Sequence, residues 1–389
     1  MRIFLSCQQA LKPHAVPAYG FWEHYFRNAL KEAGHELIET PDVDWAEGLT
    51  PMQDADRARW MGRTWQKTVD FLRGEHSRRP VDFFLGYLFP YQVEPSAVRT
   101  IRSLGIPTVN FFCDNMREFA RVPESYGDFD LHWVPEAEAR PMYAQAHAPF
   151  LYAPMPMWVP LELRNVPQTE TESVVFLGSH DLLREDLLGN VIRKGTRLQV
   201  YGAGWGGDGG TQTGVPVSVA GRVRNQLTFV RREGLRGFAM RATYQLRTRG
   251  SRDWEAVHAR PAVPMDDYLR VTRESRVVIG INRCPGFRRP FWDSLRYSRL
   301  RDIEAPMLGA CYLTETAPGL EDLYDIGAEI ETYRDAAELA DKIERLQADP
   351  TRRLQLRQRG QRRALSDHTI ERTLGRLAEK LGIPPRDRN

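Results

Sequence analysis

The sequence predicts an α/β protein of two Rossmann-like, doubly wound domains that face each other across a cleft. Three observations lead to this prediction. Short apolar stretches alternate with amphipathic ones along the 389 residues, as expected of strands and helices in parallel sheets. The stretches 81–88 (VDFFLGYL) and 106–113 (IPTVNFFC) are almost wholly apolar, which is typical of strands buried on both faces. Three prolines within 153–160 separate two such series, because proline fits neither helices nor central strands.

The first series begins with a strand at 2–5 and an amphipathic helix at 20–33, which Gly34 ends. The later elements are expected as a strand at 35–39, a helix at 54–73, a strand at 81–88, a helix at 94–104, strands at 106–113 and 131–134, and a helix at 137–146. This order predicts a sheet with helices on both faces. It places a first domain at residues 1–155.

The second series predicts a domain at residues 156–370, followed by a C-terminal helix and tail at 371–389. Its strands are expected at 173–177, 197–201, 276–281, 310–314 and 329–333, and its helices at 181–193, 300–308 and 336–346, with helical residues continuing to 381. Ligands of open α/β sheets bind beyond the carboxyl ends of the strands. Residues that follow these strands are therefore the first candidates for a binding site.

Composition excludes several classes of protein. A hydrophobic content of 42% and a charged content of 27% are typical of soluble globular proteins. No apolar stretch is long enough for a transmembrane segment, and the first residues do not resemble a signal peptide. We therefore expect a cytoplasmic protein. The cysteines are far apart and form no C-x-x-C pair, so we expect reduced core residues at Cys7, Cys113, Cys284 and Cys311.

Residues 221–260 contain ten arginines and only three acidic residues, although the formal net charge of the chain is +3. The simplest interpretation is a solvated, helix-rich basic insertion in the second domain. The alternative is a peripheral contact with an anionic surface or acceptor, because apolar residues such as Phe229 and Phe238 lie among the arginines. A nucleic-acid-binding protein would also explain this segment, and its binding would depend strongly on salt.

Glycines follow two strands of the second domain. Gly178 and Ser179 lie between a strand and a helix, where backbone N–H groups and the helix dipole can receive a phosphate. Arg184, one turn into that helix, could neutralise the charge of the phosphate. Gly202 follows the next strand. In the simpler interpretation, Ser179 or Asp181 only caps the helix. The glycines match a dinucleotide-binding fingerprint poorly, so NAD binding is weakly supported.

Glu304 stands at the head of a stretch of small and apolar residues. The two oxygens of a carboxylate can accept hydrogen bonds from the adjacent hydroxyls of a ribose. Arg283 and Arg288, just upstream in NRCPGFRRPF, suit a pyrophosphate. In the alternative interpretation, Glu304 only forms an ion pair with Arg301 within one helix.

Residues 174 to about 373 carry the motifs VVFLGS, VYGAGW, VVIGIN, LRDIEAPMLGACYLTE, GAEIETYRDAAELADKIERLQADPTRR and HTIERTL. With these motifs the second half resembles the glycosyltransferase group 1 pattern of the GT-B fold, in particular the family that includes the spore maturation protein CgeB. In that family an arginine-containing helix leads into a glutamate, which corresponds here to Glu304 and adds Arg301 to the expected donor-binding residues. The E-x7-E pattern of the wider superfamily is incomplete, because Arg296 stands eight residues before Glu304. The first half resembles the family more loosely, through GHELIE and IPTVNFFCDN.

The resemblance implies transfer of a sugar from a nucleotide-diphosphate sugar, bound by the second domain, to an acceptor bound by the first. The acceptor could be a glycan, a small molecule, a protein or a nucleic acid. No cofactor and no metal are expected, since arginines and the amides of Gly178 and Ser179 would stabilise the leaving diphosphate. The three D-x-D pairs at 42–44, 54–56 and 128–130 are interpreted as loop or surface acids.

A reaction that inverts the sugar needs a general base. Asp114 follows a strand of the first domain, and His14 lies in the first loop. In the simpler interpretations, Asp114 caps a helix or turn and His14 is an exposed loop residue. Two further functions stay open beside nucleic-acid binding: a nucleotide-sugar epimerase of the same architecture, which would need no acceptor, and a non-catalytic binding protein.

Overall fold

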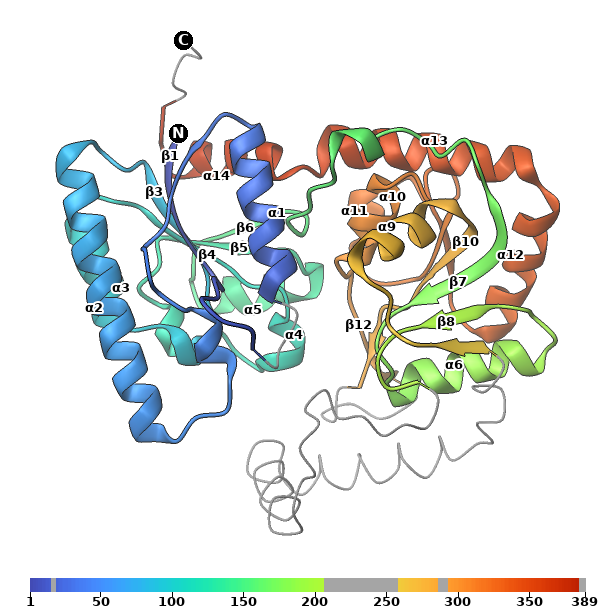
Figure 1. The fold of residues 1–389 in the computed structure, drawn as a ribbon, viewed down its shortest axis with the longest axis horizontal. Helices are drawn as coiled ribbons and strands as arrows, with labels where there is room; N and C mark the ends of the chain where they lie inside the picture. Colours follow the sequence, from blue (N-terminus) through green and yellow to red (C-terminus); the bar gives the residue numbers. More distant parts are fainter. Residues whose placement is uncertain (15–18, 206–257, 286–292, 385–389) are drawn as a thin grey trace. The chain divides into compact units, whose positions relative to one another are not determined.

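The structure is a computed structural model that describes residues 1–14, 19–205, 258–285 and 293–384. The chain forms two compact units: unit 1 contains Met1–Trp158 and Ser366–Asn389, and unit 2 contains Val159–Leu365. Each unit has a six-stranded sheet (Figure 1), and every strand pairing in both sheets is parallel. The prediction of two parallel α/β domains is therefore confirmed. The end of the chain belongs to unit 1, whereas residues 371–389 were expected to form a C-terminal helix and tail after the second domain.

The sheet of unit 1 has the strand order β2-β1-β3-β4-β5-β6. Its strands are β1 (Arg2–Cys7), β2 (Glu36–Ile38), β3 (Phe83–Tyr87), β4 (Thr108–Phe111), β5 (Leu131–Val134) and β6 (Phe150–Tyr152). Strands β1, β3, β4 and β5 are buried along their whole length. Their continuous apolar stretches are the reason, because helices cover such strands on both faces.

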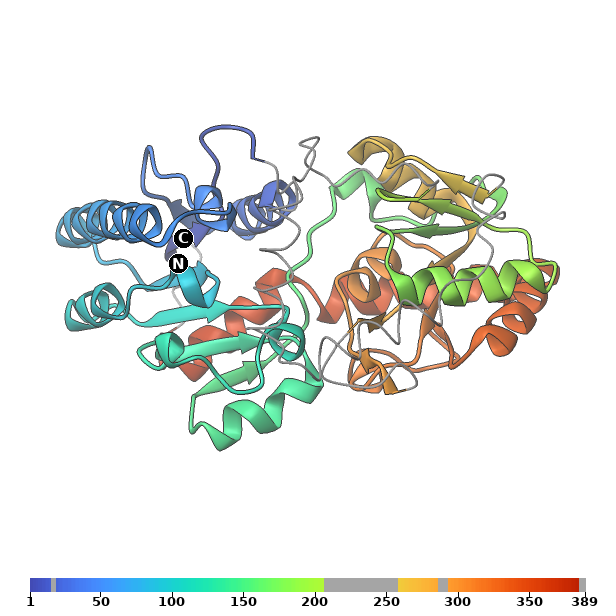
Figure 2. The same cartoon turned by 90° about the horizontal axis from the view of Figure 1, so that it is seen from below.

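Helices lie on both faces of this sheet. They are α1 (Tyr19–Glu32), α2 (Asp54–Arg78), α3 (Pro95–Ser103), α4 (Asn115–Glu118), α5 (Arg140–Gln145) and α14 (Ile370–Lys380). Helix α14 contacts α1 and β6, while α2 contacts α3. Figures 1 and 2 show α2 and α3 on the side of the sheet away from α1. Helix α14 buries Ile370, Leu374 and Leu377, so the last helix completes the core of unit 1.

The sheet of unit 2 has the strand order β14-β13-β10-β7-β8-β9. Its strands are β7 (Thr171–Leu177), β8 (Gln199–Tyr201), β9 (Ala259–Arg260), β10 (Ser275–Gly280), β13 (Tyr312–Glu315) and β14 (Glu331–Tyr333). A separate antiparallel hairpin pairs β11 (Arg283–Cys284) with β12 (Leu295–Arg296). The direction of winding reverses between β7 and β10. This reversal is the topological switch point, where open α/β sheets bind ligands.

In the described part of unit 2 the helices are α6 (Leu182–Arg193), α9 (Met265–Glu274), α10 (Arg301–Met307), α11 (Leu320–Leu323), α12 (Ala336–Ala348) and α13 (Pro350–Asp367). Helices α6 and α12 contact each other and pack with the strands into one apolar core, which includes Leu188 and Ile343. Helix α9 contacts β7 and β10, and α10 contacts β10 and β13. Short 3-10 turns occupy Ala46–Leu49, Pro90–Gln92, Glu124–Tyr126, Ala137–Ala139 and Leu161–Leu163.

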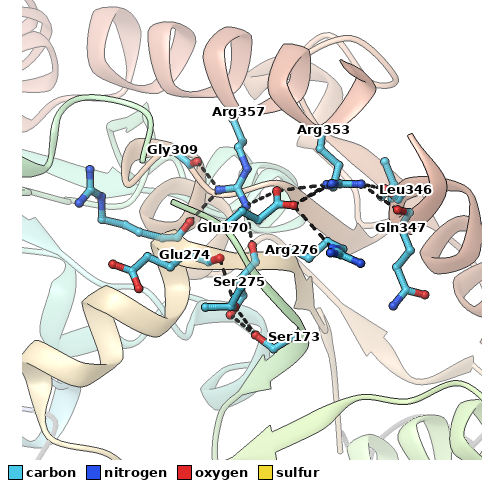
Figure 3. Close-up of polar contacts among 12 residues, drawn as sticks. Glu170, Ser173, Glu274, Ser275, Arg276, Gly309, Leu346, Gln347, Arg353 and Arg357 are labelled. Carbon is cyan, nitrogen blue, oxygen red and sulfur yellow. Dashed lines mark hydrogen bonds and ion pairs between the residues drawn. The ribbon is translucent and has the colours of Figure 1, made fainter. Parts of the chain in front are cut away.

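Glu170, just before β7, is the centre of an ion-pair cluster (Figure 3). Its Oε1 lies 2.7 Å from Nη2 of Arg353, and its Oε2 lies 3.2 Å from Nη2 of Arg357. Both arginines come from α13, and their side chains are only 7% and 4% exposed. Arg357 also donates to the carbonyl oxygens of Gly309 and Ser275. The cluster therefore fastens α13 to the start of β10 and to the loop before β13.

All four cysteines are buried and none forms a disulfide, as expected of reduced core residues. Among the described residues, none of the helices has the length and apolar character that a membrane crossing requires. The expected cytoplasmic location stays a prediction. Arg288 and most of the basic insertion, residues 221–257, lie outside the described residues, so the suggested contact with an anionic surface also stays a prediction.

Candidate functional site

The loops after β7 and β8 lie against each other at the carboxyl edge of the unit 2 sheet. The N–H of Gly178 donates to Tyr201 O at 2.8 Å, and the N–H of His180 donates to Ala203 O at 2.9 Å. Gly202 has φ +152°, and a Cβ there would lie 2.1 Å from the carbonyl oxygen of Gly178. Only glycine permits this approach.

The amide of Gly178, which was expected to bind a phosphate together with that of Ser179, donates to Tyr201 O in this structure. Asp181 caps α6, because its Oδ1 accepts from the N–H groups of Leu183 and Arg184 at 2.9 and 3.0 Å. The capping interpretation of Asp181 is thus confirmed. Donor binding by Gly178, Ser179 and Gly202 stays a prediction.

Three arginines gather at the end of β7. Arg184 donates to Ser179 O at 2.7 Å, and Arg301, reaching across from α10, donates to Leu177 O at 2.8 Å. Burial, together with the neighbouring charges of Arg299 and Arg301, lowers the pKa of Arg184 to about 10, although Asp181 opposes this shift. Asp181 lies 3.1 Å from Nε of Arg184, and Glu304 lies 3.8 Å from Nη1 of Arg301, so two carboxylates offset part of the positive charge of the three guanidinium groups. The site suits an anion with several oxygens, such as a diphosphate.

Glu304 lies on the same helix as Arg301 and is only 3% exposed. Its Oε2 accepts a hydrogen bond from the hydroxyl of Tyr268 on α9 and lies 3.8 Å from Nη1 of Arg301. The guanidinium of Arg301 in turn lies 4.9 Å from the centre of the Tyr268 ring. The intrahelical contact considered as the alternative role of Glu304 is therefore present. Contact of Glu304 with a ribose stays a prediction.

Tyr268 was not among the predicted site residues, because no helix was expected at α9. The segment MDDYLRVTRE has two acidic residues in its first turn, Asp266 and Asp267, and a basic residue in its last turn, Arg273. This arrangement favours a helix and could have revealed α9. Nothing in the local sequence pairs Tyr268 with Glu304, however, since 36 positions separate them. Burial and the charge of Glu304 raise the pKa of Tyr268, so this phenol stays protonated as the hydrogen-bond donor.

Arg283, predicted to bind pyrophosphate, is held by a buried carboxylate. Its Nε lies 2.7 Å from Oε1 of Glu315, which is fully buried at the end of β13. Arg296, the residue that departs from E-x7-E, donates to the same oxygen at 2.8 Å. Arg283 and Arg296 are cross-strand partners in the β11–β12 hairpin. Glu315 therefore neutralises like charges that would otherwise repel, and phosphate binding by Arg283 stays a prediction.

A buried polar network fixes α10 on the sheet and so positions Arg301 and Glu304. Asp302 is fully buried and accepts hydrogen bonds at 2.8 Å from the hydroxyls of Tyr312 and Thr314. A Cβ at Gly280 on the neighbouring strand would lie 2.1 Å from the Tyr312 hydroxyl oxygen. Burial raises the pKa of Asp302, although its hydrogen bonds oppose that shift. Neither partner was identified from the sequence, because Tyr312 and Thr314 lie on β13, 10 and 12 positions after Asp302.

His14 in unit 1 is paired with a carboxylate. Its Nε2 lies 2.8 Å from Oδ2 of Asp44, and the two side chains are 5% and 7% exposed. The interpretation of His14 as an exposed loop residue is therefore wrong. Asp44 also accepts from the N–H groups of Leu11 and Glu47. These bonds fix the carboxylate and, through it, the imidazole ring.

Asp114 is also in unit 1 and lies beyond the carboxyl end of strand β4. It occupies the N-cap position of α4, but its side chain makes no capping hydrogen bond, so the helix-cap interpretation is not supported. The fully buried Glu136 follows the neighbouring strand β5. Burial and the charge of Asp114 raise the pKa of Glu136 well above its ordinary value. A catalytic role for Asp114 or His14 stays a prediction.

The D-x-D pairs take part in local structure. Asp54 and Asp56 lie in the first turn of α2. Asp128 pairs with Arg99 at 2.6 Å, and Asp130 accepts from the backbone of Thr108 at 2.8 Å. Within the described ranges, no group of three or more His, Cys, Asp or Glu side chains is arranged to hold a metal ion.

The chain is similar to known glycosyltransferases. The family described as glycosyl transferase-like matches residues 184–379. Sucrose-phosphate synthase from Thermosynechococcus elongatus has a TM-score of 0.57 at 13% identity, with 98% of each chain covered. A glycosyltransferase from Rickettsia africae has a TM-score of 0.56 at 8% identity, with 97% of each chain covered. HepE from Anabaena, solved in complex with UDP, has a TM-score of 0.54 at 11% identity, with 98% of this chain and 100% of that chain covered.

No curated protein matches the chain in sequence. At such low identities, the similarities to solved structures establish the fold alone. They confirm the GT-B architecture that the resemblance implied.

Proposed function

The chain belongs to the glycosyl transferase-like family, and from this premise we propose that it moves a sugar from a nucleotide-diphosphate sugar to an acceptor. The observation that carries the proposal is the placement of Arg184 and Arg301 at the end of β7, where they donate to Ser179 O and Leu177 O, with the charge of Arg299 close enough to act on Arg184. HepE, which shares the fold, has been solved with UDP and with UDP-glucose. These complexes support a UDP-sugar as the donor. We further propose that the chain belongs to the CgeB-like family of these glycosyltransferases.

The three arginines would bind the oxygens of the diphosphate, which is the geometry that guanidinium groups favour. Their charges support a transfer that needs no metal, because they can offset the charge of the leaving nucleoside diphosphate. Glu304 would accept hydrogen bonds from the ribose hydroxyls. The Tyr268 hydroxyl already binds one of its oxygens and would hold the carboxylate in place.

In the transfer, a hydroxyl oxygen of the acceptor forms a bond to the anomeric carbon of the sugar. The bond from that carbon to the diphosphate oxygen breaks, and the nucleoside diphosphate leaves with the electron pair. The hydroxyl proton passes to a base, for which unit 1 offers Asp114 and His14, the latter held by Asp44.

Donor binding is tested by thermal unfolding with UDP-glucose, UDP-galactose, UDP-N-acetylglucosamine and GDP-mannose. We expect at least one of them to raise the Tm of the full chain, because a ligand that binds only the folded state stabilises it. In Glu304→Gln the affinity for that donor should fall by about tenfold, since a hydrogen bond to a charged group is lost.

The matched control is Glu321→Gln, which replaces an exposed residue of α11. This variant should bind the donor with unchanged affinity. Unaltered donor affinity in both Glu304→Ala and Glu304→Gln would exclude the ribose contact. No Tm shift and no turnover with any donor would exclude glycosyl transfer. Conversion of the donor without an acceptor, giving an isomeric nucleotide sugar, would indicate an epimerase.

The base is tested by Asp114→Asn and His14→Gln, both close in shape to the original residues. We expect the base variant to lose about a hundredfold or more in kcat while its KM for the donor changes little, because general-base catalysis contributes that much. Steady-state kinetics with the donor found above gives both constants. A variant with unchanged kcat removes that residue from the mechanism.

A further inference from the structure

A pocket of about 500 Å³ lies within unit 1, between the residues that follow β3 and those that follow β4. Its size falls in the range of small-molecule sites. It is lined chiefly by three aromatic and three charged residues: Phe89, Tyr91, Phe119, Glu118, Arg121 and Glu124. Strands β3 and β4 are neighbours, so the pocket lies at the carboxyl edge of the sheet, where α/β folds bind ligands.

The walls of the pocket are fixed by the core beneath them. The Phe112 ring lies edge-on to Phe89 at 4.9 Å and stacks on Phe119 at 5.0 Å, measured between ring centres. The two walls are also joined directly. Ser125 Oγ donates to Pro90 O at 3.1 Å, and Tyr126 OH donates to Leu88 O at 2.6 Å. The pocket is therefore preformed.

Tyr91 is the exposed member of this aromatic group. The residue is 44% exposed, although its ring centre lies 5.5 Å from that of Phe89 and the guanidinium of Arg57 lies over the ring, 4.9 Å from its centre. These two contacts hold the ring in place, and the part of it that stays exposed presents an apolar surface to solvent. A ligand that covers it gains the free energy of removing that surface from water.

The charged residues at the pocket restrict which ligand can cover this ring. Glu118 and Glu124 supply two carboxylates, and Arg121 and the Arg57 guanidinium beside Tyr91 supply two positive charges. Carboxylates accept hydrogen bonds from hydroxyl groups, and the balanced charges give an ionic ligand no net attraction. A neutral molecule with hydroxyl groups and an apolar face therefore fits both parts of the lining.

We propose that this pocket binds a neutral saccharide, which is the acceptor of the glycosyl transfer. The proposal rests on the proposed function. Its link to the chemistry is the segment shared with the candidate base: Asp114 precedes α4, and Glu118 is the last residue of that helix. A sugar in the pocket therefore lies beside the segment that carries Asp114.

The test uses the full chain with its best nucleotide-sugar donor and a panel of p-nitrophenyl glycosides. Neutral glucosides, galactosides and N-acetylglucosaminides are compared with a glucuronide, a glucose 6-phosphate glycoside and a short RNA. We expect transfer to a neutral glycoside. In Tyr91→Ala the KM for that glycoside should rise by about tenfold or more, because one buried aromatic contact is lost, while the Kd for the donor stays unchanged. Leu161→Ala, which truncates another exposed apolar side chain, is the control.

The outcomes separate the two proposals. Normal donor binding with transfer only to the anionic glycosides or RNA, or an unchanged acceptor KM in Tyr91→Ala, overturns the saccharide pocket and leaves glycosyl transfer standing. Failure of every donor to bind or react overturns the proposed function. In that case, saturation-transfer NMR with the neutral glycosides still tests the pocket: binding that Tyr91→Ala abolishes supports it, and no binding overturns it.

Discussion

Replacing Arg301 with alanine is expected to weaken binding of the donor nucleotide by about a hundredfold, because a charge-assisted hydrogen bond to phosphate is worth about 2–3 kcal/mol. Arg301 is already held in place for this role. It bonds to Leu177 O at the end of β7, lies over the ring of Tyr268 and faces Glu304. A guanidinium held this firmly loses little freedom when a phosphate binds. Isothermal titration calorimetry with UDP, GDP and ADP measures the change in Kd for whichever binds.

Two further variants make this result specific. Arg301→Lys keeps the charge but loses the planar, forked donor, so we expect an intermediate affinity. Arg270→Ala removes an exposed arginine from the neighbouring helix α9, where it pairs with Asp267, and should leave the Kd unchanged. Equal losses in Arg301→Ala and Arg270→Ala would point to a general effect of net charge. An unchanged Kd in Arg301→Ala would exclude this residue from the donor site.

Replacing Glu170 with glutamine is expected to lower the free energy of unfolding at neutral pH by about 2 kcal/mol, between the values typical of exposed and of buried ion pairs. The carboxylate stands between two nearly buried arginines of α13 (Figure 3). Without its charge, Arg353 and Arg357 would keep their positions in the core and lose their counter-ion. Glu172→Gln, two residues away and 93% exposed, is the matched control. Urea unfolding at neutral pH should separate the two variants.

The effect of Glu170→Gln should also depend on pH. Burial alone would raise the pKa of Glu170, but hydrogen bonds from Arg353 and the charges of Arg357 and Arg353 lower it below its ordinary value. A carboxyl group whose pKa is lower in the folded than in the unfolded state stabilises the protein. This stabilisation is complete at pH values above the unfolded-state pKa of the group, about 4.3, and is lost as the pH falls through its folded-state pKa. The difference between wild type and variant should therefore shrink in acid. A difference that stays constant down to about pH 3 would contradict the charged role of Glu170.

Much of the fold could be predicted because buried parallel strands have a strong local signal. The expected strand at 131–134 has the same bounds as β5, and the apolar stretch 81–88 contains β3. Some short strands, unlike β2, β8 and β14, gave no such signal. Strand β6 has three residues and each strand of the β11–β12 hairpin has two, so their conformation depends on the chains beside them.

The residues of the candidate site also differ in how far the sequence alone indicates them. Gly178, Gly202 and Arg301 could be proposed from the sequence because they follow strands or belong to a helix with a family motif, and their role in donor binding stays a prediction. Their partners come from distant positions. Tyr268 meets Glu304 across 36 residues, and Asp44 meets His14 across 30. Neither pair has a sequence pattern, since the contact is made by two elements that only the fold brings together.

Helix α14 has a practical consequence for anyone who wishes to produce the amino-terminal half alone. A gene fragment that stops at Trp158 would leave bare the surfaces of α1 and β6 that α14 covers, and exposed apolar surface of this kind promotes aggregation. A soluble version would need residues 366–384 supplied as well, for example by fusing them through a flexible peptide to Trp158. Cutting at the proline-rich linker divides the gene, but it does not divide the protein into its two halves.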